Sequence, residues 1–200
     1  MYCKATRHLA KVDPRLATVI QEVGPHRVSP QRGRYAALCR SIVGQQLSTK
    51  AAATIFGRFK AACGGWVTPE RVARLSDREL RAAGFSGSKV LSVRDLTRAV
   101  EERTLRLESL GRLDNEAIAQ QLLPIRGIGP WSVDMFLIFV LARPNVLPVG
   151  DLGIQNAIAR MHSLKKRPTA KRMFELTDAW QPYRSVGSWY LWRSLDTDLF

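Results

Sequence analysis

The chain has 200 residues, of which 46% are hydrophobic and 24% charged; this composition is typical of a folded globular protein and excludes wholesale disorder. Lys and Arg outnumber Asp and Glu by 31 to 17, which gives a formal net charge of +14. A positive field of this size favours a polyanionic partner, either nucleic acid or an anionic membrane surface.

A membrane span and a cysteine-based site are both unexpected. No apolar run approaches the roughly 18 residues needed to cross a bilayer, and residues 1–16 lack the apolar core of a signal peptide. We therefore expect a cytoplasmic (bacterial nucleoid) or nuclear location. Cys3, Cys39 and Cys63 are odd in number and far apart, which argues against a disulfide, a zinc site or an iron–sulfur cluster. Cys39 and Cys63 are expected to be small core residues.

The chain reads as a succession of helices with start and stop signals. Asp13-Pro14 combines an N-cap with a proline at the first helical position, and Gly24 ends that helix. Ser76 and Glu79 form a capping box. Further helices are predicted over residues 34–43, 48–64, from 68, 76–84, from 86 or 88 to about 100, 114–123, 129–142, 153–161, 169–180 and 184–194. Alternating strand patterns are nearly absent, so the predicted fold class is all-α.

The segment LLPIRGIGPWSVDMF, residues 122–136, breaks a strongly apolar stretch between two predicted helices. Gly127 and Gly129 permit unusual backbone angles around Ile128, and Pro130 suits the first turn of the second helix. Such a turn points N–H groups and the positive end of a helix dipole outward, which favours binding of a phosphate. A plain turn between two antiparallel helices is the alternative, and the turn by itself does not choose between them.

Asp151 lies in the segment LPVGDLGI, after a loop rich in proline and glycine and at the expected start of a helix. A lone aspartate at such a position usually caps the helix by accepting a backbone N–H. From its local context alone, capping is the favoured interpretation.

Three segments together carry a resemblance to a known family. IRGIGPWSVDMF, the NVLPVGD that follows it and SIVGQQLSTKAA at 41–52 resemble the HhH-GPD superfamily of DNA glycosylases, and most closely its 3-methyladenine DNA glycosylase II (AlkA) branch. The resemblance extends from about residue 8 to residue 196. It implies two helical lobes with the active-site cleft between them, one at about 35–145 and the other at about 1–34 with 146–200. We expect a version without the additional N-terminal mixed α/β domain of a larger relative.

The resemblance also implies a base pocket. The family's aspartate, which matches Asp151, faces the sugar of the extruded nucleotide, where it stabilises positive charge in the transition state. Trp131 and Trp192 match aromatic positions of the pocket, and an indole face suits a cationic alkylated base. Met135 and Leu152 stand where the best-known relative has tyrosines, which makes a less aromatic pocket. Strand-cutting relatives have a lysine at the position of Trp131, so a monofunctional enzyme is expected.

The DNA-binding residues implied by the resemblance lie in two loops. Gln46, or Leu47 as the alternative, is expected to fill the gap left by the extruded nucleotide. Carbonyl groups of Leu123, Ile125 and Ile128 match positions that hold a structural monovalent cation (Na or K) against DNA in relatives. The expected hairpin contacts are Arg126, Gly127, Ile128 and Gly129, and the remaining tryptophans, Trp66, Trp180 and Trp189, are expected in the core.

The function implied is hydrolysis of the N-glycosidic bond of alkylated purines in double-stranded DNA, by a monomer that needs no cofactor. The sequence leaves open which lesions are preferred. A second hypothesis is a non-catalytic HhH protein that binds damaged DNA, against which Asp151 argues because a binder needs no carboxylate beside phosphates. A third is a strand-cutting iron–sulfur glycosylase, against which the missing lysine and cysteine cluster argue.

Overall fold

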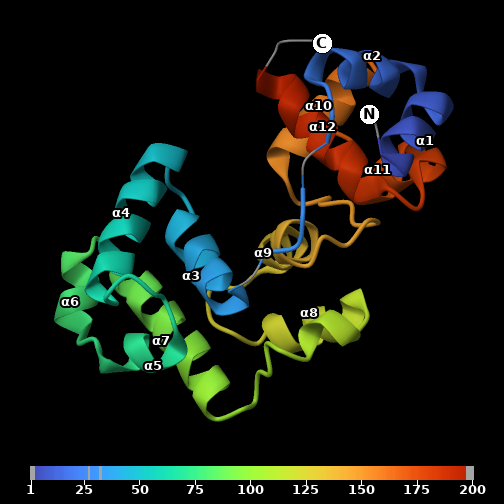
Figure 1. Ribbon diagram of the computed structural model, residues 1–200. Helices are drawn as coiled ribbons and strands as arrows, with labels where there is room; N and C mark the ends of the chain where they lie inside the picture. Colours follow the sequence, from blue (N-terminus) through green and yellow to red (C-terminus); the bar gives the residue numbers. More distant parts are fainter. Residues whose placement is uncertain (1–2, 27, 32, 197–200) are drawn as a thin grey trace. The chain divides into compact units, whose positions relative to one another are not determined.

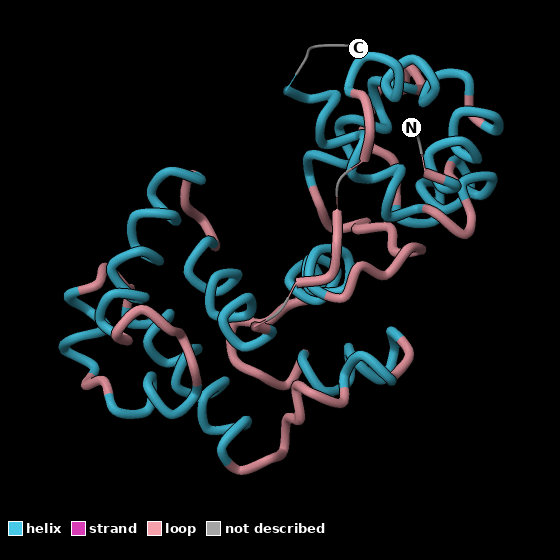
Figure 2. Tube along the Cα trace, in the orientation of Figure 1, coloured by secondary structure: helices cyan, strands magenta, loops and turns pink. Residues whose placement is uncertain are grey.

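The computed structural model describes residues 3–26, 28–31 and 33–196, and within these ranges all regular structure is helical (Figure 1, Figure 2). The predicted all-α class is therefore confirmed. The chain divides into a middle unit, residues 31–136, and a terminal unit, residues 1–30 with 137–200. Both boundaries fall earlier than the positions near 34/35 and 145/146 that the sequence predicts.

The middle unit is built around one long helix, α7. Helices α3, α5 and α6 pack on α7, and α3 also packs on α4. Cys39 and Cys63 are buried among the apolar side chains, as predicted. The elements of this unit are α3 (Arg34–Gly44), α4 (Thr49–Ala62), α5 (Pro69–Arg74), α6 (Asp77–Ala82), α7 (Gly87–Glu101), the 3-10 turn η1 (Leu110–Arg112), α8 (Asn115–Leu122) and α9 (Pro130–Met135).

The terminal unit has its core around Trp180, whose side chain is fully buried. The indole N–H of Trp180 donates to Asp13 Oδ2 at 2.8 Å, and Oδ1 of Asp13 accepts the N–H groups of Arg15 and Leu16. The predicted cap at Asp13 and the core position of Trp180 are thus confirmed. The helices are α1 (Lys4–Val12), α2 (Pro14–Val23), α10 (Leu152–Met161), α11 (Ala170–Leu176) and α12 (Arg184–Asp196), with the 3-10 turn η3 (Asp178–Trp180).

Two predicted helices are shorter than expected. The one predicted at 129–142 is α-helical only to Met135 and continues as a π-helix, η2 (Phe136–Val140). The side chains of Phe136, Leu137, Ile138 and Val140 in this segment are buried. The one predicted at 169–180 ends at Leu176, where the hydroxyl of Thr177 donates to the carbonyl of Met173 and a 3-10 turn follows.

Trp189 and Trp66 differ in how far their side chains are buried. Trp189 is half-buried and packs edge-on against Tyr190, with ring centroids 5.0 Å apart. The predicted core position of Trp66 is wrong, because 72% of its surface is exposed. Trp66 follows the turn that ends α4, so it lies on a surface loop rather than on a helix face. Within the described ranges, no helix combines the length and the apolarity that a membrane span requires.

Candidate nucleic-acid interface and catalytic carboxylate

The turn between α8 and α9 closes around two isoleucines. Ile125 and Ile128 are buried, and the N–H of Ile128 donates to the carbonyl of Ile125 at 3.0 Å. Gly129 is the N-cap of α9 and Pro130 its first residue, as predicted. Arg126 between the isoleucines is exposed. The apolar residues therefore fix the turn from inside while its polar backbone lies at the surface.

The N–H groups of this turn are not all available to a ligand. The N–H of Arg126 donates to Asp95 Oδ2 at 2.8 Å, so this N–H is already occupied within the protein. Among the described residues, the N–H groups of Gly127 and Gly129 have no acceptor. Two N–H groups at the positive end of α9 are thus the candidates for binding an anion. Asp95, on α7, fixes the loop that carries them.

Gly127 is required by both its backbone and its surroundings. Its φ of +77° lies in the left-handed region, which favours glycine. A Cβ at this position would also overlap with Ser92 Oγ, because α7 passes directly behind the turn. Gly129 has neither constraint, since its φ is −103° and no atom lies within 4 Å of where its Cβ would be.

The loop between α3 and α4, residues 44–48, is held against the same turn. Gln45 Nε2 donates to the carbonyl of Gly127 at 2.6 Å and to Ser132 Oγ at 3.3 Å. Gln46 has a φ of +59° and is exposed, and Leu47 is 38% exposed. Gln45 therefore ties the loop to the hairpin, whereas Gln46 and Leu47 are both accessible to a ligand.

Lys89, on α7, fixes the end of α3 that leads into this loop. Its Nζ donates to the carbonyls of Val43 and Gln45 at 2.8 and 2.9 Å. Burial lowers the pKa of Lys89. Sequence reasoning missed Lys89 and the anchoring roles of Gln45 and Asp95, because each contact joins residues more than thirty positions apart and no local pattern marks it.

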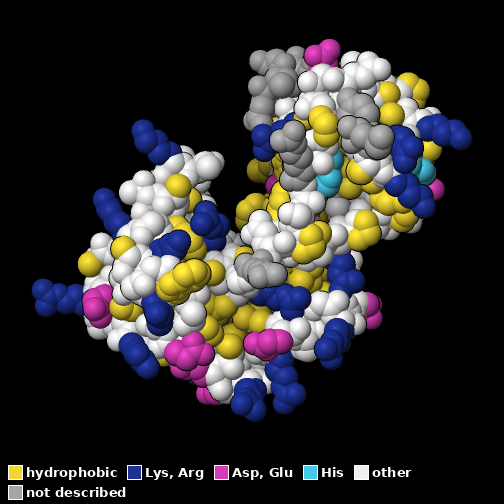
Figure 3. Space-filling model, in the orientation of Figure 1, with side chains coloured by type: hydrophobic (Ala, Val, Ile, Leu, Met, Phe, Trp, Pro, Cys, Tyr) yellow, Lys and Arg dark blue, Asp and Glu magenta, His cyan; other side chains and the backbone are white. Residues whose placement is uncertain are grey.

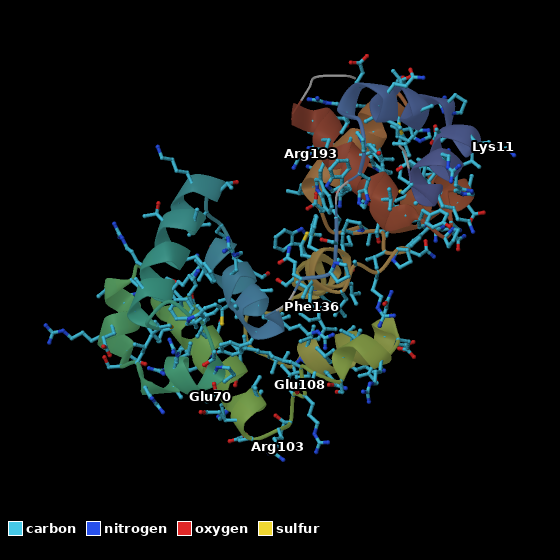
Figure 4. All side chains as sticks on the ribbon, viewed as in Figure 1. Lys11, Glu70, Arg103, Glu108, Phe136 and Arg193 are labelled. Carbon is cyan, nitrogen blue, oxygen red and sulfur yellow. The ribbon has the colours of Figure 1, made fainter. Side chains whose placement is uncertain are left out.

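Sequence reasoning also missed Asp134, which lies on α9, the helix that follows the turn. Trp131 is 40% exposed, and Asp134 and Met135 are half-buried on α9, which ends before Phe136 (Figure 4). Residues three and four positions apart share a helix face, so these three side chains project together. Burial raises the pKa of Asp134 to about 6. No hydrogen bond to its carboxyl group is found among the described residues.

In the terminal unit, Asp151 is the N-cap of α10. Its Oδ1 accepts the N–H of Ile154 at 2.9 Å and the indole N–H of Trp192 at 3.1 Å. The ring of Trp192 packs on Phe139 of η2, with centroids 5.3 Å apart and planes 34° from parallel. Leu152 is 59% exposed. The expected cap is confirmed, and the bond to Trp192 brings two of the predicted site residues together.

The predicted site residues thus form two groups. The hairpin, the loop at 44–48, Trp131 and Met135 belong to the middle unit, whereas Asp151, Leu152 and Trp192 belong to the terminal unit. Among the residues that the structure describes, no group of three His, Cys, Asp or Glu side chains could hold a metal ion. Lys and Arg side chains outnumber Asp and Glu on the visible face of each unit (Figure 3).

Comparisons with known proteins place this geometry in a family. Residues 39–182 match the model of the HhH-GPD superfamily base excision DNA repair protein. DNA-3-methyladenine glycosylase 1 of Schizosaccharomyces pombe is 36% identical over 197 residues, covering 96% of this chain and 86% of that protein. YfjP of Bacillus subtilis is 38% identical over 169 residues, and the match spans 81% of this chain and 59% of that protein.

Solved structures agree with the sequence relatives. The structure of S. pombe 3-methyladenine DNA glycosylase (Mag1) in complex with abasic DNA superposes with a TM-score of 0.87 and 34% sequence identity. The superposition covers 99% of each chain. This chain and that glycosylase therefore share one fold over almost their whole length, including the region of the turn between α8 and α9.

Proposed function

The chain belongs to the HhH-GPD superfamily of base excision DNA repair proteins, and from that premise we propose that it is a monofunctional DNA glycosylase for alkylated purines of the 3-methyladenine type in duplex DNA. The observation that carries the proposal is the carboxylate of Asp151, held at the start of α10 by two N–H donors. The substrate class is supported by the relative named DNA-3-methyladenine glycosylase 1.

Binding of the duplex would rest on the hairpin. The N–H groups of Gly127 and Gly129, which have no acceptor among the described residues, would bind a backbone phosphate, and the exposed guanidinium of Arg126 would add a charge-assisted contact. The carbonyls of Leu123, Ile125 and Ile128 suit Na⁺ or K⁺ because these cations prefer oxygen ligands. The carbonyl of Ile125 already accepts one N–H but has a second lone pair. Such contacts position the DNA without reading its sequence.

Access to a stacked base requires extrusion of its nucleotide. We assign the filling of the vacated space to Gln46, with Leu47 beside it, because both project from a loop that Gln45 and Lys89 fix in place. A fixed loop reduces the conformational entropy that insertion would otherwise cost. Gln45 joins this loop to the phosphate-binding turn, so binding of the backbone and insertion into the stack would be coupled.

The chemical step breaks the bond between C1′ of the sugar and the ring nitrogen of the base. An alkylated purine that is already cationic leaves as a neutral base, so no acid is needed to protonate it. The carboxylate of Asp151 would stabilise the positive charge that develops on the sugar and accept a proton from the attacking water. The water oxygen becomes the hydroxyl on C1′ of the abasic product. Trp131 and Trp192 would provide aromatic faces for the cationic base.

The enzyme is proposed to release the base without cutting the strand. Strand-cutting relatives use a lysine amine to attack C1′ and form a Schiff base, and here Trp131 stands at that position. Base release then gives an abasic site that stays intact until it is heated in alkali. The active species is proposed to be a monomer acting on DNA of the nucleoid or nucleus.

Base release from defined duplexes tests this proposal. Duplexes carrying 3-methyladenine, 7-methylguanine or 1,N6-ethenoadenine are incubated with wild type and with Asp151→Asn. We expect wild type alone to release at least one of these bases, with strand cleavage only after heating in alkali. Binding without release from any lesion would establish the non-catalytic alternative. Cleavage through an intermediate that borohydride traps would overturn the monofunctional assignment.

A further inference from the structure

A second surface feature of the middle unit has no part in the proposed chemistry. A pocket of about 420 Å³ lies between α3, α4 and the loop that follows α4. Trp66 stands at its edge with 72% of its surface exposed. Trp side chains are highly buried on average, so an exposed Trp at the edge of a pocket is a candidate contact for a ligand.

The loop that presents Trp66 is firmly built. The N–H groups of Gly64 and Gly65 donate to the carbonyls of Ala61 and Lys60 at 2.8 and 2.9 Å, which closes the end of α4. Arg71 Nη1 donates to the carbonyls of Cys63 and Gly64 at 2.8 and 2.9 Å. The backbone that leads into Trp66 is therefore held in place, and a ligand would not have to order it.

The lining of the pocket combines apolar surface with positive charge. Ala37, Phe56 and Val67 supply apolar surface, and Arg40 and Lys60 supply two cations. The guanidinium of Arg40 lies over the ring of Phe56 at 4.2 Å from its centroid. No Asp or Glu lines the pocket, and neither cation forms an ion pair with a described residue.

The nearest acidic side chain in sequence does not compensate this charge. Glu70, on α5 (Figure 4), is outside the pocket lining. A hydrogen bond from Thr68 holds the pKa of Glu70 below its usual value, so the carboxylate already has a partner. Arg40 and Lys60 are therefore available to pair with acidic groups of another molecule.

Trp66 lies away from the elements proposed to bind DNA. The loop at 44–48 joins the start of α4, whereas Trp66 follows its end, and 14 residues of helix separate the two by about 20 Å. The hairpin is bonded to the 44–48 loop, so it lies toward the start of α4. The proposed contacts with a duplex do not involve Trp66, and a second copy of a chain with net charge +14 is repelled by the cations of the pocket.

From this combination we infer that the Trp66 pocket docks an acidic peptide segment of a partner protein, with one large apolar side chain placed in the pocket against Trp66. Its Asp or Glu side chains pair with Arg40 and Lys60. A rigid exposed Trp flanked by Arg is the composition of an interface hot spot. Peptide binding at this pocket does not depend on base excision, so it can be tested separately from the glycosylase proposal.

An array of synthetic acidic peptides, each with a single Trp, Phe or Leu, tests the inference on the 200-residue chain. Matched peptides lack the apolar residue, or carry Asn and Gln in place of Asp and Glu. We expect the acidic peptides with an apolar residue to bind and to shift the indole N–H signal of Trp66 in NMR spectra, leaving that of Trp189 in place. Trp66→Ala should weaken binding at least tenfold, and Arg40→Gln with Lys60→Gln should weaken it and reduce its salt dependence.

Base release by Trp66→Ala should equal that of wild type, which shows that the variant is folded. The inference is overturned if Trp66→Ala binds the same peptides as tightly as wild type, or if no peptide in the array binds. It is also overturned if an oligo-dT single strand perturbs Trp66 at lower concentration than the peptides, since stacking of bases would then explain the exposed ring. A dimer in solution that Trp66→Ala dissociates would assign the pocket to a second copy.

Discussion

In the middle unit the groups proposed to hold DNA are backbone N–H groups of a turn, whereas in the terminal unit the proposed chemistry rests on one carboxylate. The turn owes its shape to long-range contacts from Asp95, Ser92 and Gln45. Asp151 owes its position to one local N–H, in the helix that it caps, and to Trp192. We therefore expect that a change in the backbone of the turn weakens DNA binding, whereas loss of the charge on Asp151 slows base release. The two activities can then be removed separately.

The largest effect is expected from Asp151→Asn. An asparagine oxygen can accept the same two N–H groups, so α10 keeps its cap while the negative charge is lost. We expect base release to fall by at least about 100-fold with the affinity for DNA retained, because charge stabilisation acts in the transition state. Single-turnover rates and equilibrium binding measure the two quantities.

Asp114→Asn is a matched control, because Asp114 also caps a helix by accepting an N–H, from Ala117, in the other unit. It should leave both quantities unchanged. If Asp151→Asn weakened binding as much as it slowed release, the separation between the units would be wrong.

The next effect is expected from Gly127→Ala. Left-handed backbone costs a residue with a Cβ about 1–2 kcal/mol, and the overlap with Ser92 adds to this cost. We expect affinity to fall about tenfold for damaged and intact duplex alike, since phosphate contacts position without specifying. Gly129→Ala meets no atom within 4 Å and needs no left-handed backbone, so it should cost only the smaller penalty of an alanine at an N-cap. A loss confined to damaged DNA would show that the turn contributes to recognition of the lesion.

A smaller effect is expected from Lys89→Met. Without the ammonium, the carbonyls of Val43 and Gln45 lose their donor, which costs about 1–3 kcal/mol of stability and loosens the loop at 44–48. Base release should fall several-fold for a lesion in a fully paired duplex and less for one opposite a mismatch, where extrusion is easier. Lys11→Met removes an equal charge from the surface of α1 and is the control (Figure 4). Equal losses on the two substrates would contradict a role in extrusion.

The elements of the fold were largely predictable because their signals are local. The caps at Asp13, Ser76 and Asp151 and the glycine turn between α8 and α9 all lie within a few residues of the boundary that they mark. The outward position of Trp66 was not predictable, because a tryptophan beside a turn has the same local pattern whether it packs inward or outward.

The candidate site was predictable only in part. The segments that carry Asp151, Trp131 and Gln46 have a recognisable sequence, but the resemblance gives no partner for any of them. Lys89 and Asp95 act through contacts between residues distant in sequence, and an isolated lysine or aspartate on a helix carries no sign of such a contact. Whether a carboxyl group is buried or hydrogen-bonded also depends on its three-dimensional surroundings, as Asp134 and Asp151 show.

The smallest predicted effect concerns those two aspartates. Asp151 receives two N–H groups, whereas burial without a hydrogen bond raises the pKa of Asp134 to about 6 from an ordinary value of 3.8. Because the folded-state pKa is the higher one, Asp134 favours the folded state fully below about pH 4, and this stability is lost as the pH rises through 6. Asp134→Asn removes that dependence. After allowance for solvent screening at a half-buried site, we expect the variant to gain about 1 kcal/mol relative to wild type at pH 7.5 compared with pH 4. Urea unfolding at the two pH values measures the difference in unfolding free energy between variant and wild type. If this difference were the same at both pH values, the pKa of Asp134 would be the same in the folded and unfolded chains. A gain at pH 7.5 would instead show that the middle unit gives up stability to keep a carboxyl group one helical turn from Trp131.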